Sequence, residues 1–314
     1  MKRVGAVDCG TNSIRLLIAD IDDDGKSLQH ITRQMQIVRL GHGVDATKRI
    51  APESMERTLK AAREYAAACS EAGCESVRFV ATSASRDAQN ADEFIAGVQE
   101  AFTAFGTGPE VVSGHEEASL SFTGATGDLR AEGAAAPYLV LDIGGGSTEF
   151  VRGDGDVEQS HSVNMGCVRL TERHLGGDPP TEAQVAAALE NIHAGIDEAA
   201  QDVDFTGIST LVGLAGSVTT ITAHALNLSE YDSERIHGVT LPVEGVLAAC
   251  TDLVQRDREQ RAELGFMHPG RVDVIGAGAL VWRSVIERLV RDSGITHVRT
   301  SERDILDGIA LSQA

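Results

Sequence analysis

The segment 139–151, LVLDIGGGSTEFV, combines residue types that can hold a phosphate group. A glycine-rich turn after a strand exposes consecutive backbone N–H groups, and neighbouring hydroxyls add donors where no side chain obstructs an anion. We therefore predict a phosphate-binding loop made of Gly144, Gly145, Gly146, Ser147 and Thr148. The alternative is a hairpin turn without a ligand, because glycine also simply permits positive φ angles.

A second loop of the same kind lies near the N-terminus, in the segment VDCGTNS. In register, Asp8 falls over Asp142 and Gly10 over Gly144, and a Ser or Thr follows each glycine turn. An internal repeat of a phosphate-loop hairpin explains this agreement, and chance similarity of two strand-turn-strand units is the alternative. The repeat predicts that phosphate also binds to Gly10, Thr11, Asn12 and Ser13.

A third glycine-rich turn, GLAGSVTT at 213–220, follows an apolar strand and opens a helix. N–H groups at the start of a helix favour anions, so Gly216 and Ser217 are candidate ligands for a further phosphate. A tight turn selected for packing explains the same residues equally well.

Two carboxylates, Asp142 and Glu149, flank the first loop, and the hairpin returns both toward the same opening. They would repel phosphate oxygens unless a hard divalent cation intervened. Mg²⁺ is typically held by one or two carboxylates with phosphates and water, so we predict bound Mg²⁺, with Mn²⁺ as the other metal considered. Asp8, the counterpart of Asp142, is a further candidate metal ligand. The alternative is that Glu149 is a solvated strand residue.

A helix with two glutamates begins in SGHEEASLSF at 113–122. Ser113 suits an N-cap and Glu116 the third position of a capping box, so Glu116 has a structural explanation. Glu117 lacks that explanation, and a carboxylate one turn into a helix can activate water as a general base.

Arg86, in FVATSASRDA, follows a strand and precedes a predicted helix, where a guanidinium can grip a phosphate bidentately. Arg15 and Arg271 are further candidates. A solvated position is the alternative for any single arginine.

Strands and helices that could position these residues alternate along the chain. The first half reads as strands at 4–8 and 14–21, a helix at 53–72, a strand at 77–81 and a helix at 87–105. The second half opens with another hairpin, followed by helices at about 166–175, 181–202, 216–226, 243–263 and 277–292 and strands at 210–213 and 296–299. Apolar strands such as YLVLDI favour sheets covered by helices on both faces.

The Gly/Ala-rich segment 127–137, GDLRAEGAAAP, separates the two similar halves. We predict one domain at 1–130 and a second at 131–300. Helical spacing of Ile305, Leu306 and Ile309 predicts a last helix, within about 301–314, that packs back on the first domain.

The composition describes an acidic globular protein of 314 residues with a formal net charge of −20. This charge argues against nucleic acid as the main partner, since affinity there comes mostly from Lys and Arg. No apolar run is long enough for a signal peptide or a membrane span. The five cysteines form no CxxC pair or metal-spaced set with histidine, which indicates a reducing, cytoplasmic compartment. A homodimer is the default oligomer, although nothing in the sequence specifies one.

Taken together, the motifs resemble those of the exopolyphosphatase and guanosine pentaphosphate phosphohydrolase family, in its short actinobacterial form. The resemblance runs from Arg3 to about Ala310. It rests on VDCGTNSIRLLIAD, ATSASRDA, VSGHEEASLSFTGA, LVLDIGGGSTEF, GLAGSVTTI and ERDILDGIA, in this order. It implies two ribonuclease-H-like α/β domains, similar to those of actin, the sugar kinases and the Hsp70 ATPase domain, facing an active-site cleft.

The resemblance also implies an activity and divides the residues by role. The reaction is attack of water on the terminal phosphorus of linear inorganic polyphosphate, releasing orthophosphate. Glu117 is implied as the catalytic glutamate, Arg86 as a phosphate-binding arginine, Asp142 and Glu149 as magnesium ligands, and the loops 10–13 and 144–148 as phosphate sites.

Longer members of this family carry additional C-terminal domains that grip long polymer, and this chain ends before them. Few basic side chains are available to line a long channel, so we expect a preference for shorter chains. Guanosine pentaphosphate (pppGpp) or nucleoside triphosphates are alternative substrates, because the loops recognise phosphate alone. A non-catalytic sensor of polyphosphate or nucleotide is the alternative from another class.

Overall fold

The computed structural model describes the backbone of residues 1–314 and all side chains except those of Asp128 and Ala131. The chain divides into two compact units, here unit 1 (Met1–Gly127 with Asp304–Ala314) and unit 2 (Asp128–Arg303). The chain enters unit 2 within helix α5 (Gly114–Ala131) and returns just before helix α13 (Ile305–Leu311). The segment 127–137, which we predicted to separate the two halves, is therefore helical up to Ala131.

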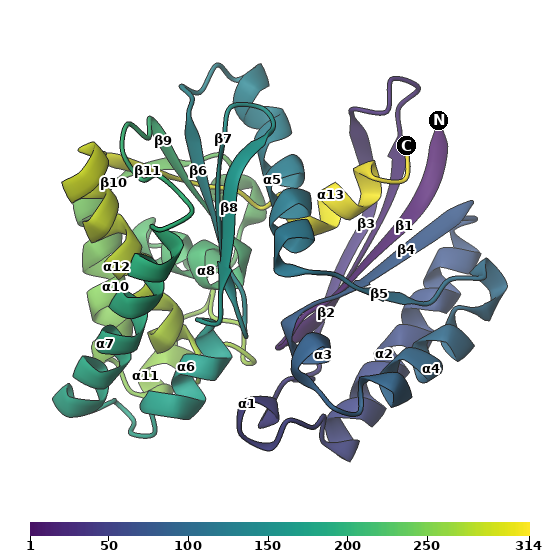
Figure 1. The fold of residues 1–314 in the computed structure, drawn as a ribbon, viewed down its shortest axis with the longest axis horizontal. Helices are drawn as coiled ribbons and strands as arrows, with labels where there is room; N and C mark the ends of the chain where they lie inside the picture. The colour runs from purple at the N-terminus through teal and green to yellow at the C-terminus, as the bar shows by residue number, and fades with distance from the viewer. The chain divides into compact units, whose positions relative to one another are not determined.

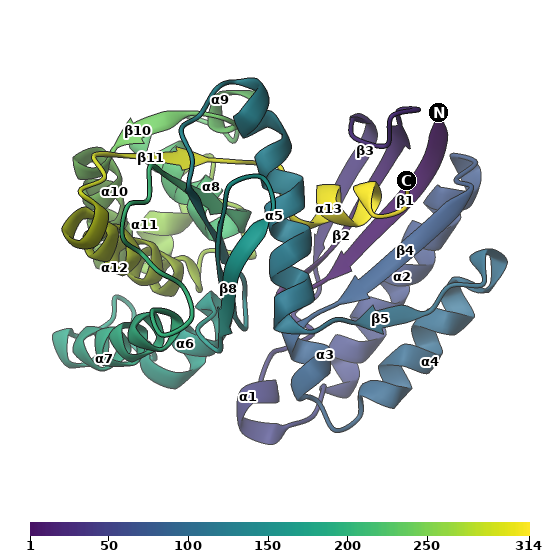
Figure 2. The ribbon, with the colours of Figure 1, turned by 45° about the horizontal axis from the view of Figure 1, so that its top comes forward.

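Unit 1 contains a five-stranded mixed sheet with the order β3-β2-β1-β4-β5 (Figure 2). The strands are β1 (Lys2–Cys9), β2 (Ser13–Ile21), β3 (Leu28–Ile37), β4 (Ser76–Ala81) and β5 (Pro109–Val111). β1 pairs antiparallel with β2 and parallel with β4. The opening hairpin was predicted, whereas β3 was missed because LQHITRQMQI is a largely polar edge strand with no regular alternation of apolar residues.

Helices cover both faces of this sheet. α2 (Pro52–Glu71) and α4 (Ala91–Ala101) pack on one face, and α13 packs on the other (Figure 1). The single helix predicted at 87–105 is wrong: α3 (Ser83–Asp87), α4 and the 3-10 turn Thr103–Phe105 take its place. The break coincides with a long-range contact, because the Asn90 side chain accepts a hydrogen bond from Ile50 N and donates one to Ile50 O.

Unit 2 repeats the same strand topology. Its six strands are β6 (Tyr138–Ile143), β7 (Thr148–Gly153), β8 (Val157–Val163), β9 (Thr210–Leu214), β10 (Thr240–Pro242) and β11 (His297–Thr300). They lie in the order β10-β11-β9-β6-β7-β8. In sheet order, the strands β8-β7-β6-β9-β11 correspond to β3-β2-β1-β4-β5 of unit 1 and run in the same relative directions. β10 is an additional antiparallel strand at the edge. The predicted fold of two ribonuclease-H-like α/β domains is confirmed in this topology.

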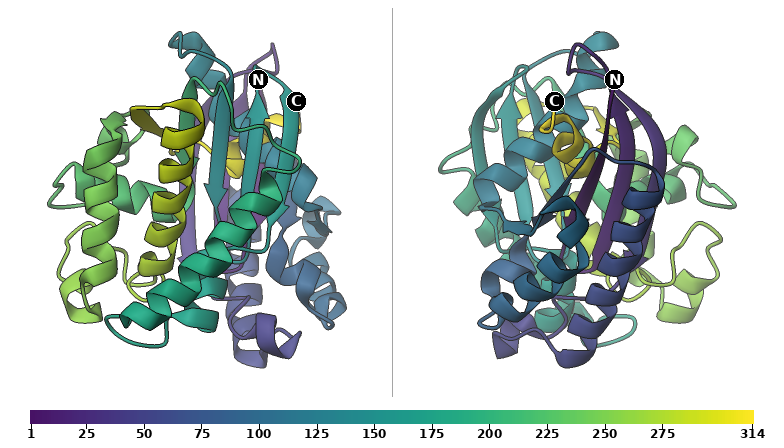
Figure 3. Two further views of the ribbon diagram at one scale, coloured as in Figure 1. Left: turned by 60° about the vertical axis from the view of Figure 1, so that its left-hand side comes forward. Right: turned by 90° about the vertical axis from the view of Figure 1, so that its right-hand side faces the viewer.

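The helices of unit 2 form a layer against its sheet (Figure 3). They are α6 (Cys167–His174), α7 (Glu182–Ala199), α8 (Ala215–Ala225), α9 (Ser233–Ile236), α10 (Val243–Gln255), α11 (Arg258–Ala262) and α12 (Ile275–Ser293). The continuous helix predicted at 243–263 is wrong, because Arg256 is extended and Asp257 starts α11 through a capping box with Gln260.

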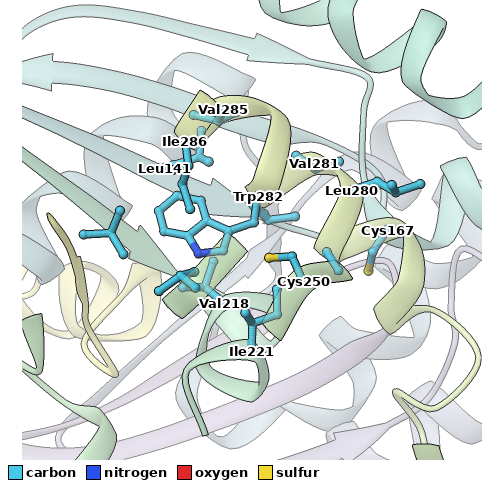
Figure 4. Packing of buried hydrophobic residues seen from close by; sticks show 14 of the residues in the cluster. Leu141, Cys167, Val218, Ile221, Cys250, Leu280, Val281, Trp282, Val285 and Ile286 are labelled. Atoms are coloured by element: carbon cyan, nitrogen blue, oxygen red, sulfur yellow. The ribbon is translucent and has the colours of Figure 1, made fainter. Parts of the chain in front are cut away.

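The core of unit 2 centres on Trp282 of α12, which is fully buried. Its indole ring lies among Leu141 of the sheet and Val218 and Ile221 of α8 (Figure 4). A Cβ at Gly213 would lie 2.8 Å from this ring, so glycine on β9 leaves room for it. This packing fixes α8, and with it the third glycine-rich turn, against the sheet.

Candidate active site

The β6–β7 hairpin of unit 2 holds the first predicted loop and its two carboxylates. Asp142 and Glu149 lie directly opposite each other in the antiparallel register, on either side of the turn. Both are buried, and Ser162 of β8 donates a hydrogen bond to Glu149 Oε1 at 2.7 Å. The predicted pairing of the two carboxylates beside the loop is thus present in the structure.

Helix α6 supports the loop from one side. Cys167 N donates to Gly144 O at 3.0 Å and Val168 N donates to Gly145 O at 2.9 Å, while Arg169 Nε donates to Gly146 O at 2.8 Å. The C=O and N–H of a trans peptide point in opposite directions. The N–H groups that follow these three carbonyls, on Gly145, Gly146 and Ser147, therefore point away from α6. Three successive N–H groups with a common direction form an anion-binding nest.

Gly166 allows this close support, which was not predicted from the sequence. A Cβ at this position would lie 2.2 Å from Gly145 C and 2.3 Å from Gly146 N. Its backbone angles, φ −100° and ψ 161°, are ordinary for any residue, so glycine is required here by space alone. The nearest sequence signal was that Gly166 stands at the start of the helix predicted at 166–175.

The β1–β2 hairpin of unit 1 has the same construction. Gly10 N donates to Ser13 O at 3.0 Å, as Gly144 N does to Ser147 O. The carbonyl of Thr11 accepts from Gly41 N, and that of Asn12 from the backbone N–H groups of residues 38 and 39. The N–H groups of Asn12 and Ser13 therefore point away from the supporting segment. The two hairpins therefore share the pattern of backbone hydrogen bonds as well as the sequence motif.

The two hairpins differ opposite the shared aspartate. Where unit 2 has Glu149 opposite Asp142, unit 1 has Arg15 opposite Asp8, with Arg15 Nη2 2.7 Å from Asp8 Oδ2. Arg15 also contacts Asp304, at the start of α13. Burial raises the pKa of Asp8, and the Arg15 guanidinium opposes this shift. Asp8 is therefore held in an ion pair with the residue opposite it in the hairpin.

Glu117 and Arg86 meet within unit 1. Glu117 lies in the first turn of α5 and is buried, and Arg86 lies in the last turn of the short helix α3. Arg86 Nη1 donates to Glu117 Oε2 at 2.8 Å and to Val112 O at 2.8 Å. The structure therefore brings together two residues singled out separately, the candidate base and the candidate phosphate-binding arginine.

Glu116, the neighbouring glutamate, has different surroundings. Its backbone N–H donates to Ser113 Oγ at 3.2 Å, as expected for an N-cap, and its carboxylate accepts from Arg78 Nη2 at 2.7 Å. Arg78 also pairs with Glu110. Glu116 belongs to a half-exposed ion-pair group and has the structural explanation that its position in the sequence suggested.

The third turn, between β9 and α8, adjoins the first loop in unit 2. Ala215 has φ +66°, a left-handed conformation that a residue other than glycine seldom adopts. The Arg271 guanidinium lies so close to Gly216 that a Cβ there would be 2.3 Å from its carbon. Ser217 hydrogen-bonds with Cys167, the first residue of α6. Gly216, Ser217 and Arg271 therefore lie near the support of the 144–148 loop.

Among the described residues, no group of three or more His, Cys, Asp or Glu side chains forms a metal site. A pair of carboxylates completed by phosphate and water is a donor set that Mg²⁺ commonly uses. Asp142 and Glu149 fit that description.

The sequence matches the Ppx/GppA phosphatase family over residues 17–313. The chain belongs to this family. As a Ppx/GppA phosphatase, the chain is a hydrolase, which confirms the enzyme class predicted from its motifs.

Similar proteins extend over the whole chain. Exopolyphosphatase 2 of Mycobacterium tuberculosis is 47% identical over 318 residues, which cover 100% of this chain and 99% of that protein. A crystal structure of an exopolyphosphatase-like protein has a TM-score of 0.94 and 42% identity, covering 99% of this chain and 98% of its own. The guanosine-5'-triphosphate,3'-diphosphate pyrophosphatase of Aeromonas salmonicida is 30% identical over 289 residues, or 90% of this chain and 54% of that protein.

No helix in the described part of this Ppx/GppA chain combines the length and the apolar character that a bilayer span needs.

Proposed function

We propose that the chain is an exopolyphosphatase, which hydrolyses the terminal phosphate of linear inorganic polyphosphate and releases orthophosphate. One observation carries the proposal: the phosphate loop occurs twice, and each copy has its carbonyls bound to a supporting segment and its N–H groups directed away from it. A loop of this construction suits the binding of a phosphate group. The 47% identity with Exopolyphosphatase 2 of M. tuberculosis supports this choice of substrate.

Glu117 is the proposed general base. Water attacks the terminal phosphorus, the P–O bond of the anhydride breaks, and Glu117 Oε accepts the proton of the attacking water. The ion pair between Arg86 Nη1 and Glu117 Oε2, at 2.8 Å, fixes the orientation of the Glu117 carboxylate. We assign phosphate binding to Arg86 as well, since a guanidinium has five N–H donors.

Backbone N–H groups supply the electrostatic part of the mechanism. In unit 2, the N–H groups of residues 145–147 are the proposed donors to phosphate oxygens. In unit 1, the N–H groups of residues 12 and 13 are the corresponding donors. They are held before the substrate arrives, so they stabilise developing negative charge with little reorganisation. Gly216, Ser217 and Arg271 add donors and a positive charge next to the support of the first loop. The N–H groups and the Arg271 charge give a local positive field, which allows an anion to bind to a chain of net charge −20.

Asp142 and Glu149 are the residues that would hold Mg²⁺, or Mn²⁺ in its place. Membership in a phosphatase family is in line with a divalent cation in general. Such an ion polarises phosphoryl oxygens when bound. Asp8 remains a predicted ligand, but its contact with Arg15 favours a role in holding the unit 1 hairpin.

A second candidate activity is hydrolysis of the 5′ γ-phosphate of pppGpp or of a nucleoside triphosphate. The similarity to the A. salmonicida pyrophosphatase favours pppGpp within this group. A polyphosphate sensor without turnover is less compatible with the buried carboxylates at 117, 142 and 149. We further propose a cytoplasmic location and a preference for short polyphosphate, the latter because of the acidic composition.

The test is phosphate release in Mg²⁺ from short and long polyphosphates, ATP and pppGpp. The parent is compared with Glu117→Gln, and Glu116→Gln is the matched control one residue away. We expect Glu117→Gln to lower kcat by about 10²–10⁴-fold with polyphosphate binding retained, and Glu116→Gln to keep parental turnover. Undiminished turnover in Glu117→Gln would remove the proposed base. Faster turnover of pppGpp than of any polyphosphate would establish the second candidate instead.

A further inference from the structure

A Schellman motif closes the C-terminal end of α2 in unit 1. Gly73 adopts φ +71°, Cys74 N donates to Cys69 O at 3.0 Å, and Gly73 N donates to Ser70 O at 3.1 Å. This motif brings the side chain three positions inside the helix end against the side chain two positions beyond it, most often as an apolar contact. Here the two side chains are Cys69 and Cys74.

The two thiols have unequal access to solvent but direct contact with each other. Cys69 is fully buried and lies against β1, where a Cβ on Gly5 would be 2.7 Å from its Sγ. Cys74 is half-buried. The thiols hydrogen-bond to each other. The Arg3 guanidinium lies beside this turn and donates to Ala72 O at 3.0 Å.

We propose that Cys69 and Cys74 form a reversible thiol-oxidation site for hydroperoxides. The Cys74 thiolate attacks the peroxide oxygen, the O–O bond breaks, and a sulfenic acid forms with release of hydroxide, or water after protonation. The Cys69 sulfur then attacks the Cys74 sulfur, an S–S bond forms, and the sulfenic hydroxyl leaves as water. In total, two thiols and one hydrogen peroxide become one disulfide and two waters.

The surroundings assign the first step to Cys74. The hydrogen bond from Cys69 lowers the pKa of Cys74, partial burial opposes the shift, and the Arg3 charge adds to it. The same hydrogen bond raises the pKa of Cys69, so the buried thiol keeps its proton until it resolves the sulfenic acid. Burial raises the pKa of Cys9, Cys167 and Cys250. Thiolate character and exposure decide the rate of oxidation, so Cys74 should react first.

This oxidation site is separate from the proposed catalytic machinery. Cys69 lies against Gly5, and the unit 1 loop begins at Gly10, five residues further along the chain. At about 3.3 Å per strand residue, the separation is roughly 16 Å. Oxidation should therefore leave phosphate release unchanged, and the modification itself is the readout.

The sequence offers a direct assay. Trypsin cuts after Arg63 and Arg78, and the 15 residues between, EYAAACSEAGCESVR, contain both cysteines. The folded chain is treated with hydrogen peroxide, free thiols are alkylated, and peptides are mapped without reductant. We expect this peptide to escape alkylation and lose about 2 Da, and dithiothreitol to restore it. Its oxidation should be at least about tenfold faster than that of the peptides containing Cys9, Cys167 or Cys250.

Two variants assign the steps. Cys69→Ala, which lacks the resolving thiol, should accumulate sulfinic acid at Cys74, and Cys74→Ser should leave Cys69 reduced. The proposal would be overturned if the peptide of the parent stayed unmodified or carried only sulfinic or sulfonic acid. A disulfide between two copies of the chain would overturn it as well. Equally fast oxidation of a buried cysteine would overturn the selectivity.

Discussion

Gly166→Ala tests whether the support beneath the phosphate loop matters for catalysis. The substitution adds one methyl group in a conformation that alanine adopts without strain. That methyl would lie 2.2 Å from Gly145 C and 2.3 Å from Gly145 O and Gly146 N. These are backbone atoms, so no change of side-chain rotamer can relieve the contact.

The geometry sets the size of the effect. Ordinary contact starts at 3.4 Å, and 3.4 Å less 2.2 Å leaves 1.2 Å by which the loop and α6 must separate. Overpacking of this kind costs about 1–3 kcal/mol. A displacement of roughly 1 Å at a positioning element can lower the rate about 100-fold. We therefore expect kcat/KM for phosphate release to fall about 100-fold. The Tm should also fall, by roughly 2–4 °C for each kcal/mol of unfolding free energy that is lost.

Gly245→Ala is the matched control in the same unit. Gly245 lies exposed in α10, and a Cβ there meets nothing within 4 Å. Alanine should keep full activity and stabilise the helix by about 0.5–1 kcal/mol. Phosphate release and thermal unfolding are measured for both variants and the parent. A Gly166→Ala variant with parental kcat/KM would show that the α6 support does not set the catalytic geometry of the loop.

Two further outcomes follow from individual contacts. Ser162→Ala removes the hydrogen bond to Glu149 and should raise the Mg²⁺ concentration for half-maximal phosphate release about tenfold; an unchanged metal titration would argue against Glu149 as a ligand. Burial acts to raise the pKa of Asp307, but contacts with His30 and Arg33 outweigh it and hold this pKa well below its usual range. Ionised Asp307 therefore contributes fully to the free energy of unfolding above the pKa that it has in the unfolded chain, about 3.9. This contribution is lost as the pH falls toward the lower pKa of Asp307 in the folded chain. Asp307→Asn should therefore destabilise the chain by about 3 kcal/mol at pH 6, with the difference shrinking below about pH 4; a gap that stays constant on acidification would contradict this.

The fold could be predicted from the sequence where the pattern was strong and local. Apolar strands such as β1 and β6 and the long helices α2, α7 and α12 have clear periodicity. The edge strands β3 and β8 carry mainly polar residues, so their pairing is decided by neighbouring strands. The breaks near Asn90 and Asp257 depend on side chains that bind backbone groups, one of them far along the chain. Periodicity contains no information of that kind.

The candidate site followed the same division. The loops and the carboxylates at 142 and 149 could be found because they are consecutive or in hairpin register. The Arg86–Glu117 contact joins residues 31 positions apart, and neither residue type nor spacing indicates it. Gly166, Ser162 and Arg169 were missed for the same reason, since each acts on the loop through tertiary packing.

The two hairpins share the features that the proposed phosphate binding needs and differ in the residues that could hold a metal. Both copies keep the glycine turn, the bound carbonyls and the N–H groups that point away from the support, and these are the features that the proposed anion binding requires. They differ opposite the shared aspartate. In unit 1, Arg15 takes this position, pairs with Asp8 and contacts Asp304 of the returning chain. In unit 2, Glu149 takes the position opposite Asp142. Two adjacent buried carboxylates are costly unless a cation compensates them. The repeat therefore combines one hairpin whose aspartate is held by an arginine with one whose two carboxylates suit the proposed metal.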